Sequence, residues 1–285
     1  MTDLTPADAQ RRQLLASFSA LAPTYDQLHF LQLCAHRLVE LTPLPAGARV
    51  LDVATGTGVV ALAVAQRVGP TGKVVGVDLS PEMLGRARQK LALAGLPQVE
   101  FREGDAQHLD LPDQSFDVVL CASSLFFVPD MVSALREWRR VLVPGGVLGF
   151  SSFCPTFLQP LRQLWEARMS HYGLTPAALP THRLADPDAC RGLLREAGLV
   201  RVEVRTEQLG YHLPGAQGRW ADIMAGLEGK PWLQLPPAQR AQAQAEHMAE
   251  LSGLVTAQGI WVDVPAILAF GRRPARRGRS VQRKS

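Results

Sequence analysis

The stretch Val50-Leu-Asp-Val-Ala-Thr-Gly-Thr-Gly58 decides the fold. Two β-forming residues, an acid, small residues and two glycines predict a buried parallel strand that ends in a tight turn. A helix is expected to open at about Val59. Because glycine has no side chain, a ligand can lie directly against the backbone of such a turn. We therefore expect this turn to be a cofactor site around which the rest of the chain is organised.

The totals indicate a single α/β domain with a sizeable insertion or cap. The 285 residues are 47% hydrophobic and 20% charged, which suffices for a real core. The four cysteines lie far apart without a C-x-x-C pair, which argues against a disulfide framework or a zinc site. No signal-peptide pattern opens the chain, and the longest uncharged stretch, 141–161, is broken by prolines and glycines. We expect a cytoplasmic protein with no membrane span and no metal.

The net charge of +4 is concentrated in the last residues. Seven basic residues and no acid lie in 272–285, and removing them leaves −3 on the first 271 residues. A terminus rich in Pro, Gly, Arg and Ser predicts a basic, disordered tail. The alternative is a tail that contacts nucleic acid or anionic lipid.

Strands alternate with helices through the middle of the chain. The pattern predicts strands over 49–53, 73–78, 99–102, 116–122, 147–153, 200–206 and 260–271, and helices over 59–68, 81–94, 131–143, 156–174, 186–197 and 237–254. One or two further helices are expected within 6–41. The fold class is therefore α/β: a Rossmann-like, seven-stranded, mostly parallel sheet with helices on both faces, plus a helical cap over the substrate site.

Ligands of open α/β sheets bind beyond the carboxyl ends of the strands. This rule brings residues 52–58, Asp78, 104–106 and 121–124 around one crevice, with Asp78 placed to accept hydrogen bonds from ribose hydroxyls. Asp52 enters the turn and would repel a pyrophosphate, so it favours a ligand with an ammonium or sulfonium group. Gly56-x-Gly58-x-x-Ala61 also matches a dinucleotide fingerprint, which leaves an NAD(P)-dependent oxidoreductase open as an alternative.

Five motifs in order resemble those of class I S-adenosylmethionine (SAM)-dependent methyltransferases. After 50–58 come Val74-Val-Gly-Val-Asp-Leu-Ser-Pro-Glu-Met-Leu84, Glu103-Gly-Asp-Ala106, Phe116-Asp-Val-Val119 and Leu135-Arg-Glu-Trp-Arg-Arg-Val-Leu-Val-Pro-Gly-Gly146. The entry segment Phe18-Ser-Ala-Leu-Ala-Pro-Thr-Tyr-Asp26 further resembles the ubiquinone/menaquinone-biosynthesis branch. The resemblance covers about 45–153 and beyond residue 155 is only architectural.

The resemblance implies that SAM is the cofactor and S-adenosylhomocysteine (SAH) the product. It implies that residues 1–45 form a helical segment closing the SAM site, with Tyr25 over the methionine end, and that 46–271 form the methyltransferase domain with cap insertions at about 155–185 and 212–258. Together with the crevice rule, it gives these cofactor-binding residues: Tyr25, Asp52, Ala54, Thr55, Gly56, Gly58, Asp78, Leu79, Met83, Gly104, Asp105, Ala106, Ala122 and Ser123.

No motif identifies the methyl acceptor or a general base. Many relatives carry a histidine soon after the fourth strand, where this chain has Phe127. Among His171, His182 and His212, we take His212 as the candidate catalytic base because it follows Tyr211 at a strand end. Five large side chains either line an apolar pocket or form the core of the cap: Trp165, Trp220, Met224, Trp232 and Trp261.

The leading hypothesis is methyl transfer to a small, partly hydrophobic or aromatic acceptor. The alternatives are an RNA methyltransferase that uses the basic tail, the oxidoreductase above, and a non-enzymatic SAM sensor. With a small-molecule substrate we expect no stable nucleic-acid complex, and a monomer or homodimer.

Overall fold

The computed structural model of the chain describes residues 6–176 and 179–275. Its α-helices are α1 (Pro6–Leu21), α2 (His29–Leu41), α3 (Val59–Val68), α4 (Pro81–Ala94), α5 (Met131–Val141), α6 (Leu161–His171), α7 (Pro187–Glu196), α8 (Ala216–Ala225) and α9 (Pro237–Ser252). Short 3-10 turns are η1 (Tyr25–Gln27), η2 (Leu125–Phe127), η3 (Pro180–Leu184), η4 (Leu227–Gly229) and η5 (Trp232–Gln234). The strands are β1 (Arg49–Val53), β2 (Lys73–Asp78), β3 (Val99–Glu103), β4 (Phe116–Cys121), β5 (Leu142–Phe153), β6 (Val200–Gln208), β7 (Tyr211–Leu213), β8 (Ile260–Val262) and β9 (Pro265–Arg272).

The seven-stranded sheet predicted from the sequence is confirmed. Its strand order is β3-β2-β1-β4-β5-β9-β6, and the first five strands are parallel. β9 is antiparallel to both of its neighbours, β5 and β6. The order reverses beside β1, so β1 and β4 flank the switch point where such sheets bind ligands. The turn after β1 therefore stands at the position that the sheet prepares for a ligand.

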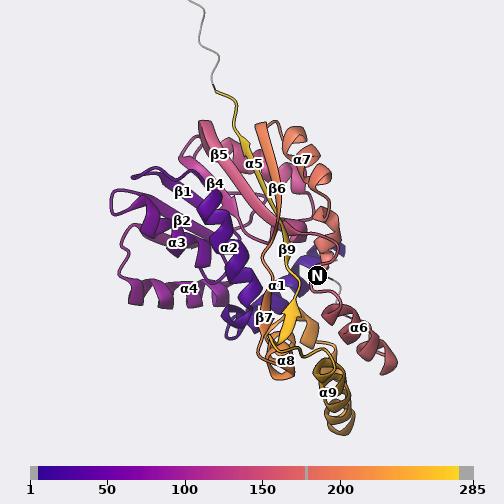
Figure 1. Ribbon diagram of the computed structural model, residues 1–285. Helices are drawn as coiled ribbons and strands as arrows, with labels where there is room; N and C mark the ends of the chain where they lie inside the picture. Colours follow the sequence, from indigo (N-terminus) through magenta and orange to yellow (C-terminus); the bar gives the residue numbers. More distant parts are fainter. Residues whose placement is uncertain (1–5, 177–178, 276–285) are drawn as a thin grey trace, which may run out of the picture.

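Helices cover both faces of this sheet (Figure 1). Alternate strand residues point to opposite sides, so Val50 packs with α2, α3 and α4, whereas Leu51 packs with α5 and α7. Both side chains are fully buried. Burial on both faces explains the nearly continuous apolar runs in these strands.

Two elements near the carboxyl end differ from what the sequence predicted. The strand expected over 260–271 is divided: β8 pairs with β7 in a separate two-stranded sheet, and β9 enters the main sheet. The division falls at Asp263 and Val264, where the carbonyl of Val264 accepts a hydrogen bond from Leu209 outside either ladder. α8 was not predicted at all, because its small and polar residues give no clear helical stripe.

Strand β9 runs one residue past the domain boundary expected at 271. Arg272 belongs to β9, and Nη1 of Arg273 donates hydrogen bonds to the backbone carbonyls of Arg139, Arg140 and Leu142. The folded chain thus includes the first two basic residues of the predicted tail. The part of that tail from residue 276 onward lies outside the described residues.

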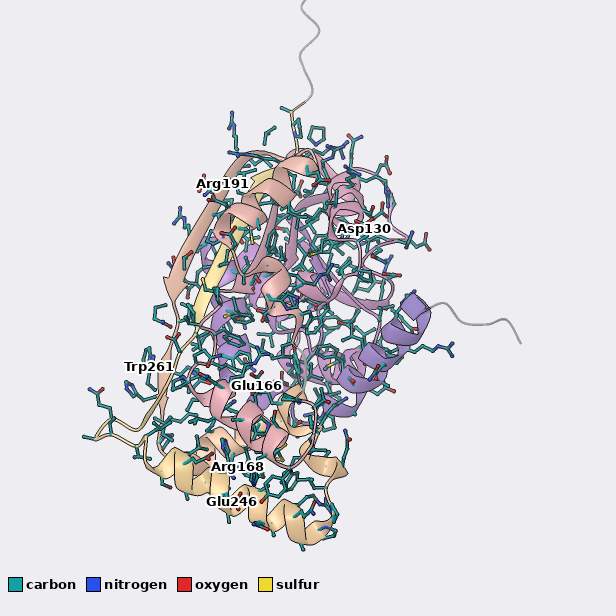
Figure 2. All side chains as sticks on the ribbon, turned by 90° about the vertical axis from the view of Figure 1, so that its right-hand side faces the viewer. Asp130, Glu166, Arg168, Arg191, Glu246 and Trp261 are labelled. Carbon is teal, nitrogen blue, oxygen red and sulfur yellow. The ribbon has the colours of Figure 1, made fainter. Side chains whose placement is uncertain are left out.

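α6, α8 and α9 gather at the end of the sheet where β7 and β8 lie (Figure 1). They share an apolar core of their own that includes Trp165, Trp220 and Ile223. Arg168 on α6 forms ion pairs with Glu246 and Glu250 on α9, and Figure 2 shows Arg168 and Glu246 side by side between the two helices. Over the residues described, no helix is both long and apolar enough to cross a bilayer.

Candidate active site at the carboxyl ends of the strands

The glycine turn after β1 is built from left-handed backbone conformations. Its φ angles are 55° at Ala54, 53° at Gly56 and 83° at Gly58. Glycine adopts them freely, but Ala54 does so at a cost of roughly 1–2 kcal/mol. The turn is tied to the sheet, because the amide of Thr55 donates to the carbonyl of Val77 over 3.0 Å. Such a strained, anchored turn is typical of a ligand-binding loop.

Asp52 lies beneath the turn and is 1% exposed. Its Oδ2 accepts hydrogen bonds from the hydroxyl of Thr55, at 2.5 Å, and from the amide of Ala61 at the start of α3, at 3.1 Å. Burial raises the pKa of Asp52 to about 7, even though both hydrogen bonds favour the charged form. A nearby cation would lower this pKa again, so the site suits a positively charged ligand.

Asp78 ends β2 beside the same turn. Its Oδ2 accepts a hydrogen bond from the amide of Gly56 at 2.8 Å, and its Oδ1 accepts one from the amide of Ser80 at 2.9 Å. Burial raises the pKa of this carboxyl group against the effect of those amides. Each carboxylate oxygen retains a further lone pair, so Asp78 can still accept hydrogen bonds from a vicinal diol.

The segment after β3 lies next to Asp78, because the amide of Gly104 donates to its carbonyl over 3.0 Å. Asp105 is half-buried: its Oδ2 pairs with Arg11 of α1 at 2.9 Å, and its Oδ1 accepts from the amide of Gln107. The carbonyl of Ala106 accepts a hydrogen bond from the Trp138 indole at 2.7 Å. The predicted Gly104–Ala106 segment is therefore in place and firmly held.

The remaining predicted cofactor-binding residues differ in how far they are buried. Ser123, after β4, has a φ of 50°, and its amide donates to the hydroxyl of Ser151 on β5 over 2.9 Å. Leu79 and Ala122 are half-buried at the crevice. Met83 is only 2% exposed and lies on the buried face of α4, in the first turn of the helix, where its amide donates to the capping hydroxyl of Ser80.

The N-terminal segment is fastened across the turn. A Cβ placed on Gly56 would lie 3.8 Å from Cε1 of Tyr25, so the Tyr25 ring stands over the turn. The neighbouring Asp26 accepts a hydrogen bond from the hydroxyl of Thr57 at 2.5 Å and forms an ion pair with Lys90 of α4 at 2.9 Å. Asp26 and Lys90 were missed from the sequence. One indication of the role of Asp26 was available from the sequence, which is that it directly follows Tyr25.

An apolar cavity of about 70 Å³ adjoins Tyr25 and Ser123. Six phenylalanines line it, together with the polar residues Thr181, Asp222 and Glu228; the phenylalanines are Phe18, Phe30, Phe126, Phe127, Phe153 and Phe157. They come from α1, α2, η2, β5 and the segment after β5, so only the folded chain brings them together. Among them, Phe127 packs edge-on against Phe18, with 5.1 Å between the ring centroids.

The structure does not support His212 as the catalytic base. His212 is exposed on β7 and contacts Trp261, and it does not line the cavity, because alternate residues of a strand face opposite sides. His171 and His182 are likewise exposed and outside the cavity.

The tryptophans also lie elsewhere than in a pocket. Trp165, Trp220 and Trp232, with Met224, form the core of the cap, and Trp261 is 40% exposed at the edge of the molecule (Figure 2). Of the two interpretations that the sequence left open, the cap core is the one observed. The aromatic side chains that line the cavity are the six phenylalanines.

Two other candidates for a functional site are a second hollow and a group of metal ligands. A larger, open hollow of about 610 Å³ lies at the amino-terminal edge of the sheet beside Pro43, Asp117 and Gly145, away from the glycine turn. Within 6–176 and 179–275, no three His, Cys, Asp or Glu side chains are arranged to hold a metal ion.

Comparisons with known proteins agree with this geometry. Residues 44–204 match the profile of a methyltransferase domain. The nocamycin O-methyltransferase of Saccharothrix syringae is 32% identical over 274 residues, 90% of this chain and 98% of that protein. The ubiquinone/menaquinone biosynthesis C-methyltransferase UbiE of Enterobacter sp. (strain 638) is 31% identical over 222 residues, 70% of this chain and 88% of that protein. The crystal structure of the YcgJ protein from Bacillus subtilis shares the fold, with a TM-score of 0.56 at 22% identity over 86% of this chain and 98% of that one.

Proposed function

The chain belongs to the class I SAM-dependent methyltransferases, and from this we propose that it methylates a small, partly hydrophobic or aromatic acceptor. Its cofactor is SAM, which supplies the methyl group as an electrophile and leaves as SAH. The observation that carries the proposal is the phenylalanine-lined cavity that adjoins both Tyr25 and Ser123.

The chemistry of the turn fits SAM. Asp78 has lone pairs for ribose hydroxyls, Asp52 favours a cation, and a Cβ on Gly56 would fill space beneath the Tyr25 ring. We assign cofactor binding to the residues around this turn, which are Tyr25, Asp52, Ala54, Thr55, Gly56, Gly58, Asp78, Leu79, Gly104, Asp105, Ala106, Ala122 and Ser123. Met83 supports them from the core rather than by contact.

In this proposal the residues around the turn position SAM and the acceptor and exclude water from them. Tyr25 and the segment from α1 to η1 cover the turn, held by the pairs Asp26–Lys90 and Arg11–Asp105. A covered site aligns two reactants and keeps water from competing, which can account for several kcal/mol of the barrier. In this proposal the N-terminal segment is the cover of the cofactor site.

The acceptor class follows from the cavity. Six aromatic rings give it an apolar, flat-sided wall, which suits an aromatic or alicyclic ring. At about 70 Å³ the cavity is smaller than a typical ligand pocket, so its lining must move apart to admit the acceptor. Both named relatives act on small molecules, by O-methyl and C-methyl transfer, which supports the same class here. A cytoplasmic location fits the four unpaired cysteines.

Two matched glycine variants test the acceptor site. Gly226 lines the cavity at the end of α8, and a Cβ there would meet Leu28 at 3.6 Å, so Gly226→Leu fills the cavity. Gly215 caps the other end of α8 and faces open space, so Gly215→Leu is the control. SAH formation is measured with SAM and a panel of small phenols, quinols and aromatic amines, with RNA as the competing substrate.

We expect turnover of a small aromatic compound, lowered about 10-fold or more in kcat/KM by Gly226→Leu and unchanged by Gly215→Leu. The affinity for SAH, measured by calorimetry, should stay the same in both variants. Turnover of RNA, or equal effects of the two substitutions, would show that the cavity is not the acceptor site.

A further inference from the structure

The cavity has one polar corner, and its carboxylates are not equivalent. Asp222 of α8 and Glu228 of η4 both line it, with exposed fractions of 6% and 9%. Glu228 is ion-paired through one oxygen: its Oε2 accepts a hydrogen bond from the fully buried Arg219 at 2.8 Å, whereas its Oε1 has no partner among the described residues. The Asp222 carboxylate accepts no hydrogen bond from any residue that the structure describes. A buried carboxylate without a donor is costly unless a ligand supplies one.

We infer that Asp222 accepts the proton from a weakly acidic hydroxyl group, a phenol or an enol, on the methyl acceptor. This rests on the proposed function, because it places that acceptor in the phenylalanine-lined cavity. The two ends of the site are joined by the fold: α8 packs on η1, where the hydroxyl of Thr24 donates to the carbonyl of Ala225 over 3.4 Å. Tyr25 and Asp222 consequently line the same cavity.

The chemistry of the corner selects among acceptors. An amine reacts through its neutral form, and a buried carboxylate would hold it as an unreactive ammonium ion. Transfer to a ring carbon leaves a second proton to remove from that carbon, whereas the corner has one carboxylate without a hydrogen-bond donor among the described residues. For a hydroxyl, the oxygen forms the bond to the methyl carbon, the carbon–sulfur bond breaks with its electron pair on sulfur, and the proton moves to Asp222, which returns it to solvent.

The surroundings of Asp222 suit a general base. Burial raises the pKa of Asp222 to about 6, while Arg219 opposes the rise and Glu228 adds to it. The remaining titratable neighbour is Tyr211 of β7, whose pKa is raised by burial and by Asp222 itself. A carboxylate of this pKa is ionised at neutral pH and still basic enough to take a phenolic proton during transfer.

Three probes of similar size test the assignment on the SAH-bound protein: 4-butylphenol, butylbenzene and 4-butylbenzylamine. Their affinities are measured for the wild type, Asp222→Ala and the control Glu203→Gln, which changes an exposed carboxylate on β6. We expect butylphenol to bind at least about 10-fold more tightly than butylbenzene, the preference for a hydrogen bond to a charged group. Asp222→Ala should abolish this preference and leave the SAH and butylbenzene affinities unchanged.

The other outcomes are informative in distinct ways. A preference for the benzylamine, or a phenol preference that survives Asp222→Ala, overturns the inference while the proposed acceptor cavity stands. Failure of all three probes to bind, with SAH bound normally, overturns the acceptor cavity and the inference with it. A protein that does not bind SAH would contradict the cofactor assignment.

The proton-acceptor role also has a kinetic signature. With 4-butylphenol and SAM, Asp222→Asn should lower kcat about 100-fold with little change in KM. It should also remove the rise of kcat with pH that the wild type shows near the pKa of Asp222. An unchanged kcat, or a methyl group on carbon in the product, would overturn the role.

Discussion

At the scale of single residues, the site depends on two acids in different surroundings. Asp52 is buried under the glycine turn with two donors on one oxygen, and Asp78 holds the turn from the end of β2. Their positions at strand ends follow from the sequence, but the hydrogen bonds that they accept from the amides of Ala61, Gly56 and Ser80 could not be predicted from it. His212 shows the opposite case, since its neighbour Tyr211 faces inward, against His29 at 4.8 Å, and His212 itself faces out.

Replacing Asp78 should weaken cofactor binding. Asp78→Ala removes the acceptor for ribose hydroxyls and leaves the amides of Gly56 and Ser80 without their partner. We expect SAM affinity to fall by about 1–3 kcal/mol, measured by calorimetry. Asp117→Ala, which loses a surface pair with Arg49 far from the turn, is the control. Unchanged affinity in Asp78→Ala would contradict the ribose assignment.

Binding of SAM should release protons through Asp52. The pKa of Asp52 is about 7 in the free protein, and a cationic ligand lowers it, so below pH 7 binding must expel a proton. SAM affinity should therefore rise with pH up to about 7 and then level off. Calorimetry between pH 5.5 and about 7, in two buffers of different ionisation enthalpy, measures the release. Asp52→Asn should abolish it, and an equal release from that variant would refute the assignment.

The same group has a defined effect on stability. Its pKa in the unfolded chain is about 3.9, so the folded protein binds more protons between that pH and about 7. The Asp52 contribution thus makes the free energy of unfolding decrease as pH rises through this interval.

At the scale of elements, the N-terminal segment depends on contacts with elements far along the chain. α1 lies against α4, where the hydroxyl of Ser19 donates to Glu82 over 2.5 Å and lies 2.9 Å from the Ser80 hydroxyl. Next along the chain, η1 places Tyr25 over the turn and Asp26 between Thr57 and Lys90. The helices were predictable from their apolar spacing, but these partners were not.

Loosening the Asp26–Lys90 pair should weaken SAH binding by opening the cover. Both side chains are 31% exposed, so solvent screens the pair and we expect about 1 kcal/mol, roughly a fivefold loss of affinity. Lys90→Met and Asp26→Asn should not add when combined, because they break one interaction. Arg86→Met on the same helix should have no effect, because the Arg86 guanidinium donates to Gln89 and forms no ion pair with any residue that the structure describes. Additive losses would indicate that the two residues act separately.

At the scale of the whole molecule, one sheet carries two functions at one edge. The parallel strands place the glycine turn, and α8 and η4 of the cap line the proposed acceptor cavity. The tryptophans pack in the separate core of the cap. They do not line the cavity. The basic end of the chain leaves the sheet at Arg272, beside the amino-terminal hollow and away from the cavity.

Two truncations separate the tail from the fold. Removing 276–285 should leave methyl transfer and its salt dependence unchanged, because those residues follow the last strand at the edge opposite the site. Removing 272–285 also deletes the Arg273 hydrogen bonds to three carbonyls, and should lower the free energy of unfolding by about 1–3 kcal/mol. Lower activity and a weaker salt dependence in the shorter truncation would instead favour nucleic acid as the substrate.

The sequence by itself determined the sheet and the cofactor turn. Buried parallel strands require apolar runs, a tight turn requires glycines, and both signals are local, so Val50–Gly58 and Asp78 were found where the structure has them. The alternation of strands and helices predicted a mostly parallel sheet, whereas the order of its strands came from the structure.

Only the tertiary structure decided the acceptor cavity and its polar corner. Phe18, Phe153 and Asp222 are far apart in the chain, and each side chain's local pattern is equally compatible with ordinary packing. Which face of β7 points inward is set by its pairing with β8, and in that pairing the His212 side chain is exposed and outside the cavity lining. Contacts between distant segments carry no local signal, and the cavity proposed as the acceptor site consists of such contacts.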